Sequence, residues 1–256
     1  MLNILLFHNI TSIPSHDFYS VTGDFFKALL NQIKDSSFSV KNLRDFYGNS
    51  LSSHDKSITF TFDDGGLSDY EIAFPLLKEL DFRGSFFITA SFVGKSGFMQ
   101  WDMIRELKDN NMEIGSHTIS HRILSRLPAE EAQEELYASR CLLEDKLGTK
   151  IDALSFPQGD FNKRIIDLAK KAGYRIMCTS TPGINGIKQL QKGILYRNSM
   201  NRAVDIPTMP SRIDPSWFNI ILARLSYEIR KGTKRIIGNE RYESVRNRLL
   251  GVNNVQ

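Results

Sequence analysis

The feature that most constrains this chain is an alternation of short apolar runs with longer segments of helical periodicity. Seven runs rich in β-branched and aromatic residues predict strands at 2–8, 57–62, 84–89, 112–116, 153–157, 174–179 and 193–197. Five segments predict helices at 23–34, 69–80, 101–110, 128–147 and 162–172. This order is typical of βα units, in which the strands form a largely parallel sheet.

Several helix boundaries carry their own signals. Pro128 opens one predicted helix, with two glutamates in its first turn, where negative charge suits the helix dipole. Gly148 and Gly173 lie where helix C-caps belong. Asp214 followed by Pro215 predicts an N-cap and the first position of a further helix.

Size and composition favour one large domain, or one domain with a modest extension. The chain has 256 residues and is 41% hydrophobic, which is enough to fill a core. Its two cysteines, Cys141 and Cys178, are far apart and indicate neither a zinc-ligand pair nor a disulfide framework. The N-terminus lacks a basic leader, and no apolar run reaches the roughly 18 residues of a membrane span. We therefore expect a cytoplasmic location, with membrane association as an option.

The net charge of +4 is concentrated in the last part of the chain. Residues 211–256 contain nine Lys/Arg and four Asp/Glu, whereas residues 1–210 contain 24 and 25. No basic module on a functional face is visible, which argues against nucleic-acid binding. We interpret 211–256 as a basic helical extension packed on the flank of the main domain. The alternative is contact with an acidic membrane or a lipid-linked substrate.

The first candidate site follows the strand at 57–62. Two adjacent carboxylates, Asp63 and Asp64, are followed there by Gly65 and Gly66. In a parallel α/β fold this places both carboxylates at the carboxyl end of a strand, where active sites lie. One could hold a cation while the other faces a substrate; an ordinary Asp-Gly turn is the alternative.

The second candidate site follows the strand at 112–116. His117 and His121 are two of only five histidines, and their spacing of four can direct both imidazoles at one metal ion. Such a pair alone is weak support for a metal site, but a pair after one strand and two aspartates after another are stronger together. His16 and His54 fall in apparent loops and have no predicted role.

Taken with a third segment, these motifs resemble a known family. The sequences TFDDG (61–65), HTISH (117–121) and FPQG (156–159) occur in the order typical of NodB-type polysaccharide deacetylases, carbohydrate esterase family 4. The resemblance covers about residues 4–201 and is greatest to the circularly permuted, exopolysaccharide-type members. It implies a distorted (β/α) barrel, which we assign to residues 1–210.

The resemblance also implies roles for individual residues. Asp63 matches the catalytic base, while Asp64, His117 and His121 match ligands of one divalent ion: zinc, with cobalt, manganese or nickel as alternatives. The family suggests that the backbone N–H of Gln158 stabilises the oxyanion of the reaction.

Two further assignments address departures from the family pattern. Common family members supply the general acid from a histidine in a late Leu-x-His motif, but no histidine follows His121 here. The resemblance to the permuted members, whose early strand carries this histidine, implies that His8, at the end of the first strand, is the candidate general acid; a buried structural histidine is the alternative. Ser155 and Gln158 stand near the usual third-motif arginine and aromatic residue. We hypothesise that Arg197 enters the site and replaces the missing charge; a surface salt bridge is the alternative. Trp101 is interpreted as a packing residue.

The function implied is metal-dependent removal of the N-acetyl group from an amino-sugar unit during surface-glycan synthesis. The substrate could be nucleotide-linked, lipid-linked or polymeric. Two other functions stay open: a superfamily amidohydrolase acting on a non-sugar amide, and a non-catalytic carbohydrate-binding protein.

Overall fold

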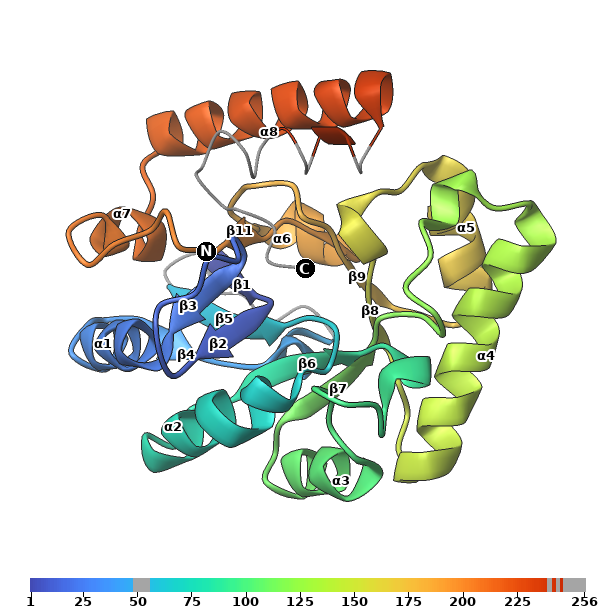
Figure 1. The fold of residues 1–256 in the computed structure, drawn as a ribbon, viewed down its shortest axis with the longest axis horizontal. Helices are drawn as coiled ribbons and strands as arrows, with labels where there is room; N and C mark the ends of the chain where they lie inside the picture. The colour runs from blue at the N-terminus through green and yellow to red at the C-terminus, as the bar shows by residue number, and fades with distance from the viewer. Residues whose placement is uncertain (48–55, 239–240, 243–244, 246–256) are drawn as a thin grey trace.

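A curled parallel sheet surrounded by helices forms the body of the molecule in a computed structural model that describes residues 1–47, 56–238, 241–242 and 245 (Figure 1). The strand order is β10-β9-β8-β7-β6-β5-β1-β11, and β4 also pairs with β5. The strands are β1 (Leu2–Phe7), β4 (Ser39–Val40), β5 (Ser57–Phe62), β6 (Gly84–Ile88), β7 (Glu113–Ser116), β8 (Ala153–Ser155), β9 (Ile176–Cys178), β10 (Ile194–Leu195) and β11 (Asn198–Ser199). This architecture confirms the expected (β/α) barrel-like class.

Apolar residues on both faces explain why these segments are strands of a covered sheet. Every residue of β1, β5, β6 and β7 is buried, as expected when a parallel sheet is covered on both sides. Aromatic rings fill the space under the helices: Phe62 stacks on Phe86 with ring centroids 4.6 Å apart, and Phe7 on Phe62 at 5.4 Å. The apolar runs that predicted strands in the sequence are therefore the residues that form the core.

One short stretch of chain brings the two ends of the sheet together. β10 pairs with β9 through Leu195 and Cys178, whereas β11 pairs with β1 through Asn198 and Leu5. Only two residues separate β10 from β11, so the opposite edges of the sheet must lie close to each other. Arg197 lies in this junction, and its backbone N–H donates to the carbonyl of Thr181.

The helices surround this sheet, as Figure 1 shows. The α-helices are α1 (Gly23–Lys34), α2 (Phe74–Glu79), α3 (Trp101–Asp109), α4 (Ala129–Leu147), α5 (Lys163–Lys171), α6 (Ile187–Lys192), α7 (Met209–Ile213) and α8 (Trp217–Ile237). Shorter segments are η1 (Leu43–Phe46), η3 (Ala90–Phe92), η4 (Leu124–Arg126) and η5 (Pro157–Gly159), which are 3₁₀ turns, and η2 (Asp69–Ala73), which is π-helical. The strands β2 (Asn9–Thr11) and β3 (Ser20–Thr22) form a separate pair.

The predicted helix ends are partly right. Gly148 is the left-handed C-cap of α4, and Gly173, with φ of 98°, follows the C-cap of α5. The predicted cap at Asp214 is wrong: Ser216 caps α8, and its side chain accepts from the N–H of Asn219 at 3.2 Å. Asp214 instead pairs with Lys56 at 2.6 Å.

The final helix, α8, differs from the expected packing. The proposed boundary at residue 210 falls inside α7, whose Met209 and Ile213 are buried in the core. The sequence was interpreted as an extension packed on the flank of the domain, and the structure leaves Trp217, Phe218 and Leu225 of α8 exposed. Residues 246–256, the end of the proposed extension, lie outside the described part of the chain. None of the described helices is both long enough and apolar enough to cross a membrane.

Candidate active site

The predicted site residues meet at the carboxyl ends of the parallel strands. His8 follows β1, Asp63 and Asp64 follow β5, and His117 follows β7. Backbone bonds fix this layout: the N–H of Asp63 donates to Phe7, and that of His117 donates to Ile88, each on the neighbouring strand. These side chains line one cavity of about 590 Å³.

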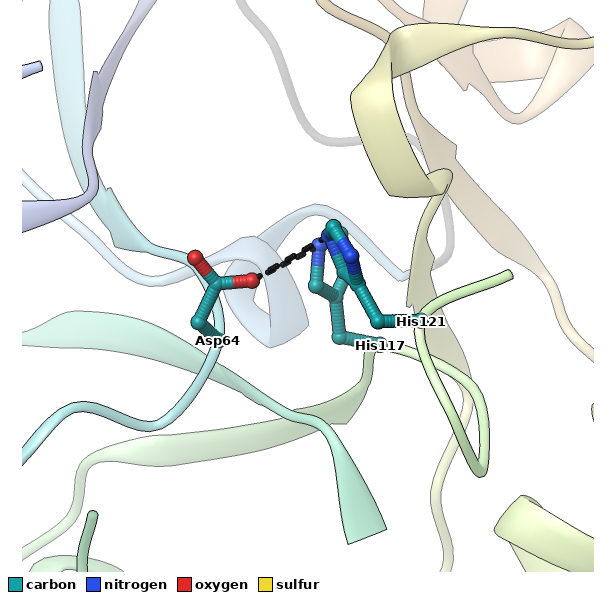
Figure 2. A group of neighbouring side chains, drawn as sticks. All are labelled: Asp64, His117 and His121. Atoms are coloured by element: carbon teal, nitrogen blue, oxygen red, sulfur yellow. Dashed lines mark ion pairs between the residues drawn. The ribbon is translucent and has the colours of Figure 1, made fainter. Parts of the chain in front are cut away.

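Three ligand-type side chains converge in this cavity. One ligand atom each from Asp64, His117 and His121 lies within 4.8 Å of the others. The Oδ1 atom of Asp64 is 3.4 Å from Nε2 of His117 and 3.3 Å from Nε2 of His121, and Figure 2 shows both imidazoles facing the carboxylate. Two strand ends and a loop thus bring together a carboxylate and two imidazoles.

The environment of these three side chains fits a divalent cation. Oδ1 of Asp64 is buried and has no hydrogen-bond partner among the described residues, although buried carboxylate oxygens normally have one. Nδ1 of His117 lies 2.9 Å from the carbonyl of Ser155, which orients Nε2 toward Asp64. Two nitrogens and one oxygen leave room for water or substrate, as in catalytic zinc sites.

Asp63 is held by a buried arginine. The carboxylate accepts two bonds from Arg197, from Nη1 at 2.7 Å and from Nη2 at 2.8 Å, and a third from Ser155 Oγ at 3.0 Å. Arg197 is fully buried, and its Nε donates to the carbonyl of Thr179 at 2.9 Å. Arg197 therefore lies where the hypothesis placed it, and the surface salt bridge is ruled out by its burial.

These contacts decide the charge on Asp63. Burial alone would raise its pKa, but the charge of Arg197, helped by His117, outweighs burial and holds the pKa well below its usual range. The contacts therefore favour the ionised form of Asp63. Burial also would raise the pKa of Asp64, and its contacts with His117 lower it instead.

His8 lies on the wall of the same cavity rather than in the core. Its ring is 5.1 Å from that of Tyr19, and it is close enough to Asp63 and Asp64 for their charges to act on it. Burial nevertheless lowers the pKa of His8 below its ordinary value. Its Nδ1 is buried without a hydrogen-bond partner among the described residues.

The remaining predicted residues are placed as follows. Gln158 lines the cavity in η5 with a left-handed backbone, φ 57°. Trp101 is partly buried and packs on the hydrophobic core, as interpreted from the sequence. His16 is exposed, and His54 lies outside the described residues. Cys141 and Cys178 are both free thiols.

Left-handed backbone conformations gather around the site. Among the described non-glycine residues, six have positive φ, and four of these are Asp64, Thr118, His121 and Gln158. Such conformations cost on the order of 1–3 kcal/mol each and persist where the surrounding structure enforces them. They re-aim the chain directly after the strands, so that Asp64 and His121 face a common point.

Sequence reasoning missed several residues that build the site. Ser155 was noted only as the position without an arginine, yet its hydroxyl binds both Asp63 and Arg197. Thr179 contributes a backbone carbonyl, for which its side chain gives no signal. The cavity is also lined by four cationic side chains, which no motif marked: Arg126, Arg230, Lys231 and Lys234.

This fold and this site define a (β/α) barrel-like protein with a candidate metal centre beside a buried Asp–Arg pair. Residues 51–177 match the family model described as polysaccharide deacetylase. The chain therefore carries a polysaccharide deacetylase domain of the NodB type.

Individual relatives agree with this family. The chain is 26% identical over 185 residues to the putative polysaccharide deacetylase YxkH of Bacillus subtilis, covering 71% of this chain and 65% of that protein. It is 27% identical over 173 residues to a poly-β-1,6-N-acetyl-D-glucosamine N-deacetylase of Staphylococcus aureus, covering 61% and 60%. The chain thus spans less than two thirds of the length of these curated relatives.

Among solved structures, the Streptococcus pyogenes deacetylase PplD, in complex with acetate, superposes with a TM-score of 0.76. The match covers 84% of this chain and 98% of PplD, at 21% identity. At that identity the likeness establishes the fold.

Proposed function

We propose that the chain hydrolyses the N-acetyl group of an amino-sugar unit, releasing acetate, with the help of one divalent metal ion. The observation that carries this proposal is that the Asp64, His117 and His121 cluster shares one cavity with the arginine-held carboxylate of Asp63. The volume of about 590 Å³ lies in the usual range of small-molecule sites and leaves room for a sugar.

Each side chain of the site has a separate role in the proposed reaction. A divalent ion, held by Asp64, His117 and His121, would supply Lewis-acid polarisation of the acetyl carbonyl and activation of water. Asp63 accepts the proton of the attacking water, while Arg197 keeps the carboxylate ionised and aimed. His8 delivers a proton to the leaving amine from another wall of the cavity, and a lowered pKa makes it the readier donor once protonated.

The cavity wall favours a substrate that carries negative charge. The cavity that contains Asp64, His117 and His121 is also lined by four cationic side chains: Arg230, Lys231 and Lys234 of α8 and Arg126 of η4. Three acidic side chains also line the cavity: Asp64 belongs to the candidate metal site, Asp63 is bound by Arg197, and Asp160 accepts from Ser125 at 2.9 Å. This balance supports an amino sugar linked to a phosphate, as in a nucleotide sugar or a lipid-linked saccharide, over a neutral polymer.

The test is acetate release from three substrates: a UDP-linked N-acetyl sugar, a polyprenyl-diphosphate-linked one and a neutral N-acetylglucosamine oligomer. Each is measured after adding zinc or cobalt to wild type and to Asp63→Asn. We expect the substitution to lower turnover by at least 10²-fold, because the proton acceptor is lost. Acetate production that is unaffected by Asp63→Asn would remove this residue from the mechanism.

The same assay separates the alternative functions. A protein that only binds carbohydrate would release no acetate with any metal, although it would still bind the sugar. An amidohydrolase for non-sugar amides would release acid from simple acetamides in preference to the sugars. The cationic cavity wall argues against the amidohydrolase for non-sugar amides, since a neutral amide gains nothing from four positive charges.

A further inference from the structure

Helix α8 turns its apolar side away from the protein. Seven large apolar side chains on it are between 43% and 84% exposed: Trp217, Phe218, Ile221, Leu222, Leu225, Ile229 and Ile236. Several of its contacts with the barrel are polar or cationic: Nε of Arg224 donates to the carbonyl of Pro182, and the Lys231 amine lies over the ring of Phe161. This is the reverse of the usual order, in which the apolar side of a surface helix faces the core.

The exposed residues form a stripe rather than a scatter. Phe218, Leu222, Leu225 and Ile229 follow one another at intervals of three or four, which places them on one side of the helix. Among the described side chains of α8, none is buried. A single exposed leucine needs no explanation, but a continuous apolar stripe marks a surface that meets something else.

We propose that this side of α8 docks on the surface of a lipid bilayer that contains anionic lipids. A helix that lies in a membrane interface combines an apolar side bearing Trp, Phe and Leu with a polar side rich in Lys and Arg. The sequence of α8 has both, with five Lys/Arg and one Glu in 21 residues. Residues 1–210 carry one more acidic than basic residue, so the positive charge of the chain is concentrated in the segment that contains α8, where Arg230, Lys231 and Lys234 lie on the side of the helix opposite the apolar stripe.

Docking through α8 would place the cavity near the membrane surface. The other side of the same helix supplies Tyr227, Arg230, Lys231 and Lys234 to the cavity that holds the metal cluster. Figure 1 shows α8 as one long helix across one side of the molecule, outside the sheet. A substrate anchored in the bilayer would therefore meet the cavity beside this helix. Membrane docking does not depend on the deacetylase reaction, and its test needs no turnover.

The first test is co-sedimentation with vesicles of phosphatidylglycerol and phosphatidylcholine, compared with phosphatidylcholine alone. We expect the wild type to bind the anionic vesicles, and to bind less at high salt. The double variant Leu225→Glu/Ile229→Glu should lose at least tenfold in affinity. The matched control is Ile187→Glu, an exposed isoleucine on α6, which should bind like wild type. Equal binding by the double variant, or none by wild type, would overturn the proposal.

The second test follows Trp217 directly. The chain has two tryptophans, so a Trp101→Phe background leaves Trp217 as the only tryptophan emitter. We expect a blue shift on anionic vesicles, and quenching by lipids with brominated acyl chains. An unchanged spectrum on bound vesicles would exclude insertion of this side. A dimer in sedimentation velocity that the double variant converts to monomer would assign the stripe to a second copy and overturn the proposal.

Discussion

At the scale of single residues, Asp63 and Arg197 form an ion pair inside the protein, out of contact with bulk water. Both side chains are buried, and two hydrogen bonds of 2.7 and 2.8 Å join them. Removing one partner of such a pair leaves the other charge without compensation in a medium that solvates it poorly. The pair is therefore needed for stability, as well as supporting the base of the proposed reaction.

Arg197→Met should destabilise the fold by roughly 3–5 kcal/mol at neutral pH, because Asp63 loses its countercharge. Burial, then opposed only by the weaker effects of His117 and His8, would raise the pKa of Asp63 above its native value. Urea unfolding at pH 7 measures the loss. Arg197→Lys keeps the charge but loses the two parallel hydrogen bonds, so its free energy of unfolding should lie between those of wild type and Arg197→Met. The double variant Asp63→Asn/Arg197→Met should recover part of the stability; a loss no smaller than that of Arg197→Met would contradict a coupled pair.

His8→Asn should slow release of an amine far more than release of a leaving group that needs no proton. Loss of a general acid costs about 10²–10⁴-fold in turnover of the N-acetyl sugar. Hydrolysis of 4-nitrophenyl acetate, whose phenolate departs unprotonated, should fall much less. The two rates are compared for wild type and variant at one pH. Equal losses on both substrates would mean that His8 has a structural role.

At the scale of elements, the π-helical η2 holds a buried acid close to the site. Asp69 is fully buried, and burial, with the charges of Asp64 and Asp63, raises its pKa well above the usual value. Neither carboxylate oxygen has a partner with hydrogen-bond geometry among the described residues. The expected helix at 69–80 thus divides into η2 and α2, and η2 carries an acid that is most stable when protonated.

Asp69→Asn should make the metal-free protein less sensitive to rising pH. Because the folded pKa is raised, the native state holds this proton more tightly than the unfolded chain does. Stability from this group is therefore complete below the unfolded pKa of about 3.9 and is lost as pH rises through the folded pKa. The loss is about 1.4 kcal/mol for each pH unit between the two values.

Urea unfolding of wild type and Asp69→Asn from pH 4 to 8, with a chelator present, measures this slope. The variant should gain stability relative to wild type toward neutral pH. Parallel pH profiles for the two proteins would show that Asp69 does not titrate in this range.

At the scale of the whole molecule, a metal ion would join segments that are distant in sequence. Asp64 follows β5, whereas His117 and His121 follow β7, so an ion bound to all three links these parts of the sheet. A ligand present at 100 times its Kd stabilises the native state by about 2.7 kcal/mol. In a protein of this size, that corresponds to roughly 5–10 °C in Tm.

Thermal unfolding should therefore shift upward by that amount on adding zinc to protein treated with a chelator. His121→Ala should lose the shift because one of three ligands is gone. His16→Ala, at an exposed histidine away from the cluster, should keep it. A shift that survives in His121→Ala would place the ion elsewhere.

Most of the core sheet and of the candidate metal site could be predicted from local patterns. Buried parallel strands need apolar runs, and parallel strands end on the same edge, so the sequence alone groups Asp63, Asp64 and His117. His121 followed from its spacing to His117. The short β2, β3, β4 and β11 were missed, because strands of two or three residues are too short for periodicity to mark.

The sequence by itself determined the class of fold and the candidate metal ligands, because buried strands leave apolar runs and the motifs of a known family stand at their ends. Tertiary structure alone decided how Arg197 reaches Asp63, since that contact depends on β10 and β11 joining opposite edges of the sheet. It also decided which side of α8 faces outward. A helical pattern shows that an apolar side exists, but the contacts of Arg224, Tyr227 and Lys231 with the barrel determine where that side points.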